Sequence, residues 1–221
     1  MEHHDEKSCF NRLRHRYDCI DVEAGTDHGI YVANVTDYCI DEVSDHTMAL
    51  LLACARKIVF LDRHVKNGSW NVKLSAPVYS ISNKTLGLVG YGKIGRKVSQ
   101  KAQAFGMKVI SCDPNVSPEF MKQNNAGHSD LETLLKESDF VSLQVPLTKD
   151  TCHLIGEIEL KMMKNTSFLI NTSRGPLIDE KALYKALAKK LIAGAGIDVV
   201  EEEPLAGYQE PLAGYQGPRP M

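Results

Sequence analysis

Two hydrophobic patterns follow each other along the chain. Between residues 41 and 67, apolar residues recur at roughly helical spacing, which predicts one long helix over 41–67 that Gly68 ends. Before it, an apolar run predicts a short strand over 29–34. Residues 1–20 are charged and irregular, and no regular element is predicted there.

From Thr85 onward, short apolar runs alternate with amphipathic segments. This alternation is typical of a parallel sheet that helices cover on both faces. The pattern therefore predicts an α/β fold of the Rossmann type, a doubly wound parallel sheet. The predicted strands are 85–89, 108–112, 140–145, 167–171 and 193–199, and the predicted helices are 93–105, 131–136, 157–163 and 180–190.

The tail, residues 204–221, differs in composition from the rest of the chain. The segment Glu203-Pro-Leu-Ala-Gly-Tyr-Gln209 is repeated at once over 210–216, and Gly217, Pro218 and Pro220 follow. Sequence so rich in proline and glycine cannot bury a core, so we predict a tail outside the folded domain.

Composition narrows the class of protein. The chain has 26 Lys and Arg against 28 Asp and Glu, a net charge of −2. It therefore lacks the positive electrostatic potential that is expected of a nucleic-acid-binding protein. The six cysteines form no CxxC pair and no zinc spacing, which predicts reduced thiols, no metal site and a cytoplasmic location. No signal peptide is visible, and the longest apolar stretch is too short to span a membrane.

The clearest motif is Gly90-x-Gly92-x-x-Gly95, which lies between a predicted strand and a predicted helix. Gly90 permits a tight turn, Gly92 allows a pyrophosphate to approach the backbone, and Gly95 allows close packing of the helix. Asp113 follows the next predicted strand and can accept hydrogen bonds from a ribose, which favours NAD over NADP. The cofactor-binding residues predicted here are Gly90, Tyr91, Gly92, Lys93, Ile94, Gly95 and Asp113. The alternative is a glycine-rich turn of another α/β protein.

A second group of motifs follows the last two predicted strands. Asn171-Thr-Ser-Arg174-Gly175 follows one of them, and Gly194-Ala-Gly-Ile-Asp198 ends the next. Ligands of open parallel sheets bind at the carboxyl ends of the strands. Since a guanidinium pairs well with a carboxylate, Arg174 is a candidate ligand for an acidic substrate.

Together with Val145-Pro-Leu-Thr148 and Glu203-Pro204, these motifs resemble the D-isomer-specific 2-hydroxyacid dehydrogenases, a family that includes phosphoglycerate dehydrogenase and hydroxypyruvate reductase. The resemblance runs from about Tyr17 to Pro204. It implies an NAD-dependent oxidoreductase that transfers a hydride between nicotinamide and a small 2-hydroxy or 2-oxo acid of the phosphoglycerate or glycerate/hydroxypyruvate class. It also implies a homodimer that pairs through the region of the long helix.

The resemblance assigns roles to individual residues. Arg174 matches the arginine that holds the substrate carboxylate, and Glu203 matches the acid that pairs with a catalytic histidine. The cofactor-lining positions are Val145, Pro146 and Thr151 on the adenosine side, and Thr172, Ser173, Arg174 and Asp198 toward the nicotinamide. Two alternatives stay open: Arg174 as a surface ion-pair partner, and Glu203 as one charge of the solvated acidic run 201–203.

The sequence also departs from the family pattern. The family's proton-donating histidine lies in a Pro-His segment beyond the Glu-Pro, which this sequence does not contain, and its own histidines, His46 among them, are interpreted as surface or packing residues. Arg14 and Arg16 stand where the family has glycines. We therefore expect a chain truncated at both ends: 1–40 a remnant of a flavodoxin-like substrate domain, 41–203 the NAD-binding domain and 204–221 the tail. The alternative function is a catalytically incomplete NAD(H)-binding module or truncated pseudoenzyme.

Overall fold

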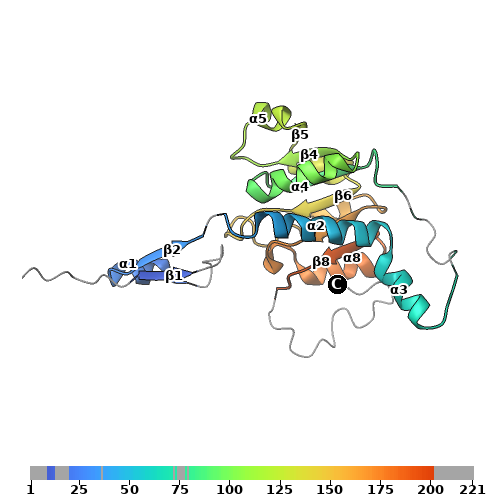
Figure 1. The fold of residues 1–221 in the computed structure, drawn as a ribbon, viewed down its shortest axis with the longest axis horizontal. Coiled ribbons are helices and arrows are strands. Elements are labelled where there is room, and N and C mark those ends of the chain that lie inside the picture. The colour runs from blue at the N-terminus through green and yellow to red at the C-terminus, as the bar shows by residue number, and fades with distance from the viewer. Residues whose placement is uncertain are drawn as a thin grey trace, which may run out of the picture. The chain divides into compact units, whose positions relative to one another are not determined.

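A computed structural model describes residues 9–12, 20–35, 37–71, 73, 78 and 80–201 of the chain (Figure 1). The chain divides into two compact units, Met1–Glu42 and Val43–Met221. The predicted tail over 204–221 and the candidate residue Glu203 lie outside the described residues.

The first unit contains a parallel pair of strands with a helix between them. Strand β1 (Cys9–Arg12) pairs with β2 (Tyr31–Asn34), and α1 (Val22–Asp27) lies between them in the sequence. The predicted strand over 29–34 is confirmed as β2. The expectation of no regular element over 1–20 is wrong at β1, because a strand this short shows no periodicity. The assignment of this unit to a substrate domain stays a prediction.

The second unit is built on a six-stranded sheet in which every neighbouring pair is parallel. Its strand order is β5-β4-β3-β6-β7-β8, so the order reverses beside β3. This confirms the doubly wound α/β fold predicted from the alternation of strands and helices. The strands are β3 (Thr85–Val89), β4 (Lys108–Cys112), β5 (Ala126–His128), β6 (Phe140–Leu143), β7 (Phe168–Asn171) and β8 (Gly194–Ile197).

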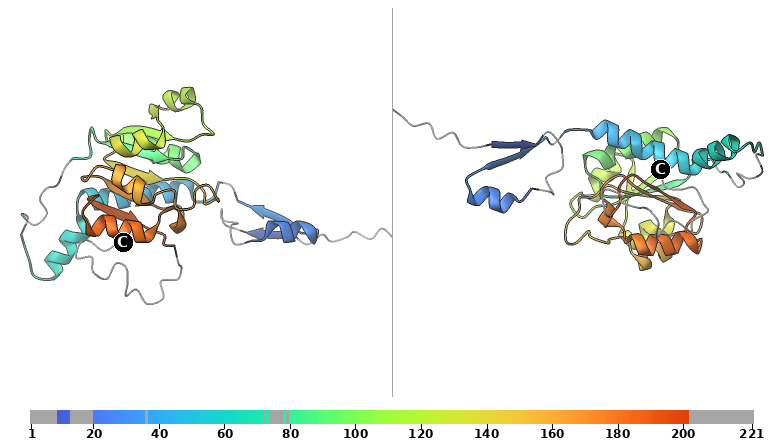
Figure 2. Two further views of the ribbon diagram at one scale, coloured as in Figure 1. Left: turned by 180° about the vertical axis from the view of Figure 1, so that it is seen from behind. Right: turned by 90° about the horizontal axis from the view of Figure 1, so that it is seen from below.

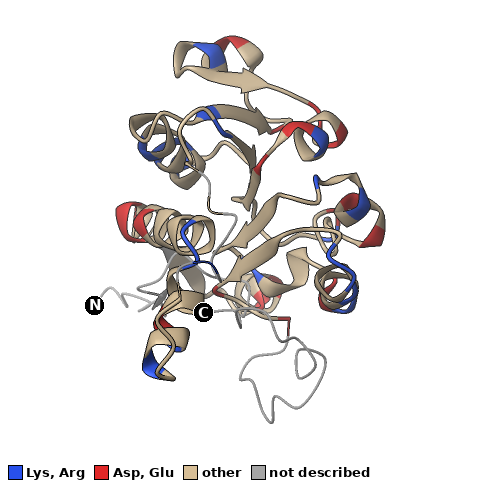
Figure 3. Cartoon of the chain, turned by 90° about the vertical axis from the view of Figure 1, so that its right-hand side faces the viewer, with Lys and Arg blue, Asp and Glu red and all other residues tan. Residues whose placement is uncertain are grey.

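Helices cover both faces of this sheet, and each face has its own buried core (Figures 1 and 3). On one face, Leu51 of α2 (Ile40–Ala55) and Val98 of α4 (Lys93–Ala104) pack with residues of β3. The other face is covered by α6 (Leu131–Glu137), α7 (Glu157–Met162) and α8 (Glu180–Ala188). Charges of both signs lie along the helices (Figure 3).

The predicted helix over 41–67 is wrong in one respect: it is two helices. Helix α2 ends at Ala55, and α3 (Ile58–Lys66) begins after Lys57, which has a left-handed φ of 53°. A left-handed residue interrupts the backbone ladder of a helix. The hydrophobic spacing continues across the break, so the pattern alone could not detect it. Helix α3 leads away from the sheet, and none of its residues is buried (Figure 2).

One α-helix and one strand of the second unit were not predicted. Helix α5 (Pro118–Gln123) begins after Ser117, whose hydroxyl accepts a hydrogen bond from Phe120 N at 3.2 Å. Serine before proline is a helix-start signal. The edge strand β5 has three residues, too few to show an alternating pattern, and it pairs with β4.

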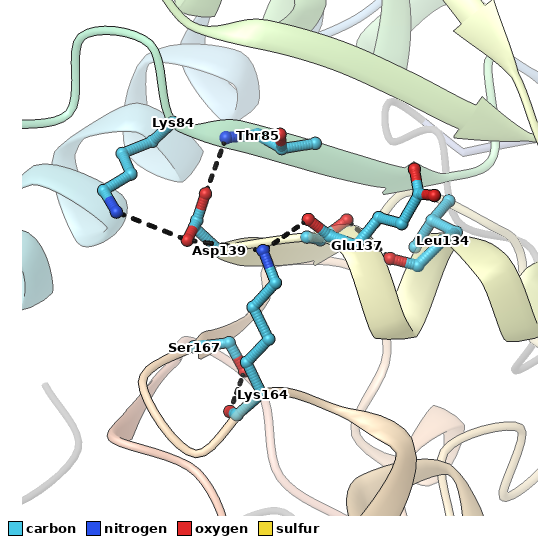
Figure 4. Close-up of polar contacts among 8 residues, drawn as sticks. Lys84, Thr85, Leu134, Glu137, Asp139, Lys164 and Ser167 are labelled. Atoms are coloured by element: carbon cyan, nitrogen blue, oxygen red, sulfur yellow. Dashed lines mark hydrogen bonds and ion pairs between the residues drawn. The ribbon is translucent and has the colours of Figure 1, made fainter.

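At the amino edge of the sheet, Asp139 joins three strands (Figure 4). Its Oδ2 accepts a hydrogen bond from Thr85 N at 2.9 Å, at the start of β3. Its Oδ1 lies 3.5 Å from the Nζ atoms of both Lys84 and Lys164. Lys164 Nζ also donates to Glu137 O at 2.6 Å. Because the side chain of Asp139 is only 17% exposed, these contacts satisfy a carboxylate that is largely out of water.

The described cysteines Cys39, Cys54, Cys112 and Cys152 are free thiols. Burial raises the pKa of the Cys54 thiol to about 11. In the part of the chain that the structure describes, no helix is long and apolar enough to cross a membrane.

Candidate cofactor and active site

The glycine-rich turn lies where the strand order reverses, between the carboxyl ends of β3 and β6. Gly90 follows β3 with a φ of +99°, and its N–H donates to Cys112 O at 2.9 Å. A Cβ on Gly90 would lie 2.5 Å from Gln144 O. Both the backbone conformation and the neighbouring strand therefore require glycine, as the sequence predicts.

The other two glycines of the motif differ from each other. A Cβ on Gly95 would lie 2.5 Å from Gly90 O, so glycine is needed for α4 to pack against the turn. A Cβ on Gly92 would meet nothing within 4 Å, and its φ of −69° is open to any residue. No described part of the chain therefore explains glycine at position 92. The absence of a side chain at Gly92 leaves open space beside the amino end of α4, where backbone N–H groups and the helix dipole favour a phosphate.

The three residues between the glycines have different environments. The ring of Tyr91 is buried, with its hydroxyl 3.4 Å from Ser99 Oγ, so only its backbone can meet a ligand. Ile94 packs against the core beneath α4. Lys93 is exposed in the first turn of the helix and keeps a side chain in reach of an anion.

Asp113, after β4, holds the glycine-rich turn from the side. Its Oδ2 accepts from Tyr91 N at 2.8 Å, and its Oδ1 accepts from Asn115 N at 2.9 Å. Burial, then the charges of Asp113 and Asp130, raise the pKa of the Cys112 thiol. Two carboxylates thus place negative charge at this end of the site, which disfavours an additional phosphate on a bound ribose.

The loop after β7 carries Thr172, Ser173 and Arg174. Asn171 fixes this loop, because its Oδ1 accepts from Ser173 N at 3.0 Å and its Nδ2 donates to Arg174 O at 2.8 Å. Ser173 Oγ donates to Leu143 O at 2.8 Å, which joins the loop to the end of β6. Arg174 is half-buried, and its Nη1 donates to Ser173 O at 2.8 Å. The guanidinium is therefore held close to the carboxyl edge of the sheet.

The loop after β6 carries Val145, Pro146 and Thr151. Val145 packs against the core, and Pro146 is exposed. Thr151 Oγ1 donates to Pro146 O at 2.7 Å and accepts from Thr148 N at 2.7 Å. The loop is thus closed by its own hydrogen bonds, and the role of Thr151 that the structure supports is to shape it.

Two residues of α2 reach the same edge and were not predicted. Thr47 Oγ1 lies 2.8 Å from Thr172 Oγ1 and accepts from Gln144 Nε2 at 3.4 Å. His46 Nε2 lies 3.1 Å from Asp198 Oδ1, just after β8. The structure is consistent with the interpretation of His46 as a surface histidine, since its side chain is 50% exposed, and adds that the ring contacts a candidate site residue. The available signal was the polar pair His46-Thr47 directly before a long apolar run.

The candidate residues thus gather along one edge of the sheet, after β3, β4, β6, β7 and β8. The sequence profile described as the NAD-binding domain of D-isomer-specific 2-hydroxyacid dehydrogenases matches residues 48–216. The chain belongs to this family. It carries the family's NAD-binding domain, and the open space at Gly92 beside the amino end of α4 fits the pyrophosphate of that cofactor.

Relatives of this dehydrogenase domain share both its sequence and its fold. A glyoxylate reductase of Thermococcus litoralis is 50% identical over 194 residues, which cover 85% of this chain and 59% of the relative. A D-lactate dehydrogenase of Aquifex aeolicus, solved with NAD and lactic acid, superposes with a TM-score of 0.81 at 34% identity, covering 88% of this chain and 58% of that one. A glyoxylate reductase from Paecilomyes thermophila gives a TM-score of 0.83 at 35% identity, covering 91% and 61%. The chain therefore spans less than two thirds of the length of these relatives.

Proposed function

We propose that this chain is the NAD-binding part of an oxidoreductase that interconverts a small 2-hydroxy acid and its 2-oxo acid. One observation carries the proposal: the turn Gly90–Gly95, with open space at Gly92, lies on the same sheet edge as Arg174. A phosphate-binding turn and a guanidinium at one edge suit a reaction between a dinucleotide and a carboxylic acid.

In this proposal each part of the edge has a separate task. Bound NADH supplies the hydride. The amino end of α4 holds the pyrophosphate, and Asp113 accepts hydrogen bonds from the adenosine ribose. Arg174 binds the substrate carboxylate and, through its positive charge, polarises the adjacent carbonyl. Thr172 and Asp198 line the nicotinamide end. Glu203, which lies outside the described residues, is assigned from the family resemblance alone to assist a proton donor.

The substrate that the proposal favours is a short 2-oxo acid such as glyoxylate or hydroxypyruvate. The relatives named above are called glyoxylate reductases and D-lactate dehydrogenase, and all of these names refer to acids of two or three carbons. This narrows the expected class away from phosphoglycerate, whose phosphate would need a further cationic site.

The test is NADH oxidation by the full chain with glyoxylate and hydroxypyruvate, in parallel with NADH binding. Arg174→Ala is expected to lower kcat/KM by about 100-fold, because a charge-assisted bidentate contact is lost, while NADH affinity changes far less. Arg174→Lys is expected to restore little, since an ammonium cannot reproduce the fork. Lys136→Ala, on the outer side of α6, is the control for loss of one positive charge. NADH binding without reduction of any 2-oxo acid would contradict the proposed activity and favour the NAD(H)-binding module.

We further propose that the protein pairs with a second copy through α3. This helix buries none of its residues, and Ile58 and Val65 are 53% and 49% exposed. Trp70, just beyond the helix, is 85% exposed. Exposed large apolar side chains on and just after one helix support an interface there.

A further inference from the structure

Four consecutive residues of one turn of α2 contact either α4 or the carboxyl edge of the sheet. Lys101 Nζ, on α4, donates to Ser44 Oγ and to Asp45 Oδ1, both at 2.6 Å. Thr47 contacts Thr172, as described above. His46 lies between these anchors, so the fold fixes the backbone on both sides of its imidazole. The ring therefore has a defined position at the carboxyl edge of the sheet.

The contact between His46 and Asp198 has a definite direction. A carboxylate can only accept a hydrogen bond, so the hydrogen lies on Nε2 and His46 is the donor. The backbone of Asp198 is held as well, because its N–H donates to Asn171 O at 3.0 Å. Among the described residues, the second oxygen, Oδ2, accepts no hydrogen bond. One oxygen is thus engaged by the protein, and the other faces no partner in this part of the chain.

Stability does not explain this pair. The side chains of His46 and Asp198 are 50% and 47% exposed, and ion pairs in such surroundings contribute little to folding. The same helix turn is also attached by the buried contact between Thr47 and Thr172, so it does not need the His46–Asp198 pair as an anchor. The pair is better explained by the place it occupies, beside the residues proposed to line the nicotinamide.

We propose that His46 is a positioning residue for the nicotinamide end of the cofactor. By donating to Oδ1, it holds the carboxylate of Asp198 in one orientation and leaves Oδ2 as a fixed acceptor. The ligand group that fits such an acceptor is an amide N–H, which the carboxamide of nicotinamide supplies. The inference rests on the proposed function, in which Asp198 lies at that end of the site.

The test compares two ligands by calorimetry on the full chain: NADH, and ADP-ribose, which lacks the nicotinamide. His46→Leu removes the donor and is expected to weaken NADH about tenfold while leaving ADP-ribose within about twofold. His46→Gln keeps an N–H donor at a similar distance from the helix and is expected to restore NADH affinity to within about threefold of the wild type. His28→Leu, an exposed histidine of the first unit, is the matched control and should change neither affinity.

Three outcomes would overturn the inference. NADH affinity unchanged in His46→Leu would show that the pair does not support the nicotinamide end. Equal weakening of NADH and ADP-ribose would show a general effect of the helix, and failure of His46→Gln to restore binding would show that the ring's shape, not its donor, matters. Failure of the proposed function is seen separately, as wild-type protein that binds NADH and reduces no 2-oxo acid.

Discussion

The backbone N–H of Tyr91 donates to Oδ2 of Asp113 at 2.8 Å, which joins the glycine-rich turn to the end of the neighbouring strand. The carboxylate that the sequence assigns to the ribose is therefore also a support of the turn that is expected to hold the pyrophosphate. Since each carboxylate oxygen has a second lone pair, both tasks are compatible. This hydrogen bond therefore joins the part of the proposed site that binds the ribose to the turn that binds the pyrophosphate.

Replacing Asp113 tests this double role. Asp113→Asn removes the charge and one of the two acceptors, so NADH affinity should fall by about 10- to 100-fold. NADPH affinity should fall less or rise, because the repulsion of a 2′-phosphate is relieved. Fluorescence titration with both cofactors measures the change. Asp179→Asn removes one carboxylate charge at the N-cap of α8 and keeps an oxygen that accepts from Ala182 N, so it is the matched control, and an equal loss in that variant would refute a local effect.

Asp139 offers a prediction about stability alone. Asp139→Asn should lower the free energy of unfolding by about 1–3 kcal/mol, because Lys84, Lys164 and Thr85 N lose a shared charged acceptor. Urea denaturation measures this loss. NADH affinity should not change, since the cluster lies at the amino edge of the sheet. Glu132→Gln, in an exposed helical pair with Lys136, should cost less than about 0.5 kcal/mol. Equal costs for the two variants would argue against this account of Asp139.

The cysteines should differ in reactivity with pH. Burial raises the pKa of Cys54 to about 11, so at pH 8 only about one thiol in a thousand is ionised. The exposed Cys152 should therefore be alkylated by iodoacetamide before Cys54 at pH 8, and Cys54 should react only as the pH approaches 11 or the fold opens. Peptide mass spectrometry assigns the sites. Fast alkylation of Cys54 in the native protein at pH 8 would be inconsistent with its burial beneath the sheet.

The proposed dimer gives a prediction of its own. Ile58→Glu together with Val65→Glu should convert the dimer to a monomer in light scattering, because two charges would be buried in the interface. Each protomer should keep its fold, since neither side chain is buried within the chain. A wild-type protein that is monomeric at high concentration would remove the basis of this proposal.

The sequence predicted the sheet and the cofactor turn because both depend on local patterns. Alternating apolar runs determine the strands, and Gly90 is required by a turn that adjoins its own strand. The break between α2 and α3 depends on the left-handed conformation of Lys57, a residue with no special preference for it. Periodicity cannot detect a change in one backbone angle.

The contact that sequence reasoning missed joins two residues that are far apart in the chain. His46 and Asp198 lie 152 positions apart and meet because α2 packs beside β7 and beside Gly196 of β8. Strand ends are recognisable in the sequence of a parallel sheet, whereas the packing of a helix beside that edge depends on the tertiary fold. The available clue was a group of polar residues, Ser44, His46 and Thr47. They lie in a helix that is predicted from the spacing of its apolar residues.

Gly92 tests the central claim most directly, by comparison with Gly95. A Cβ at position 92 meets nothing in the described chain, so Gly92→Ala should change the free energy of unfolding by less than about 1 kcal/mol. A Cβ at position 95 would lie 2.5 Å from Gly90 O, so Gly95→Ala should cost about 1–3 kcal/mol.

The deciding measurement is therefore the NADH dissociation constant of Gly92→Ala, taken with its urea midpoint. If the turn holds the pyrophosphate, NADH binding should weaken at least roughly tenfold while the midpoint stays close to that of the wild type. NADH affinity equal to that of the wild type would contradict the assignment of this turn as the phosphate site.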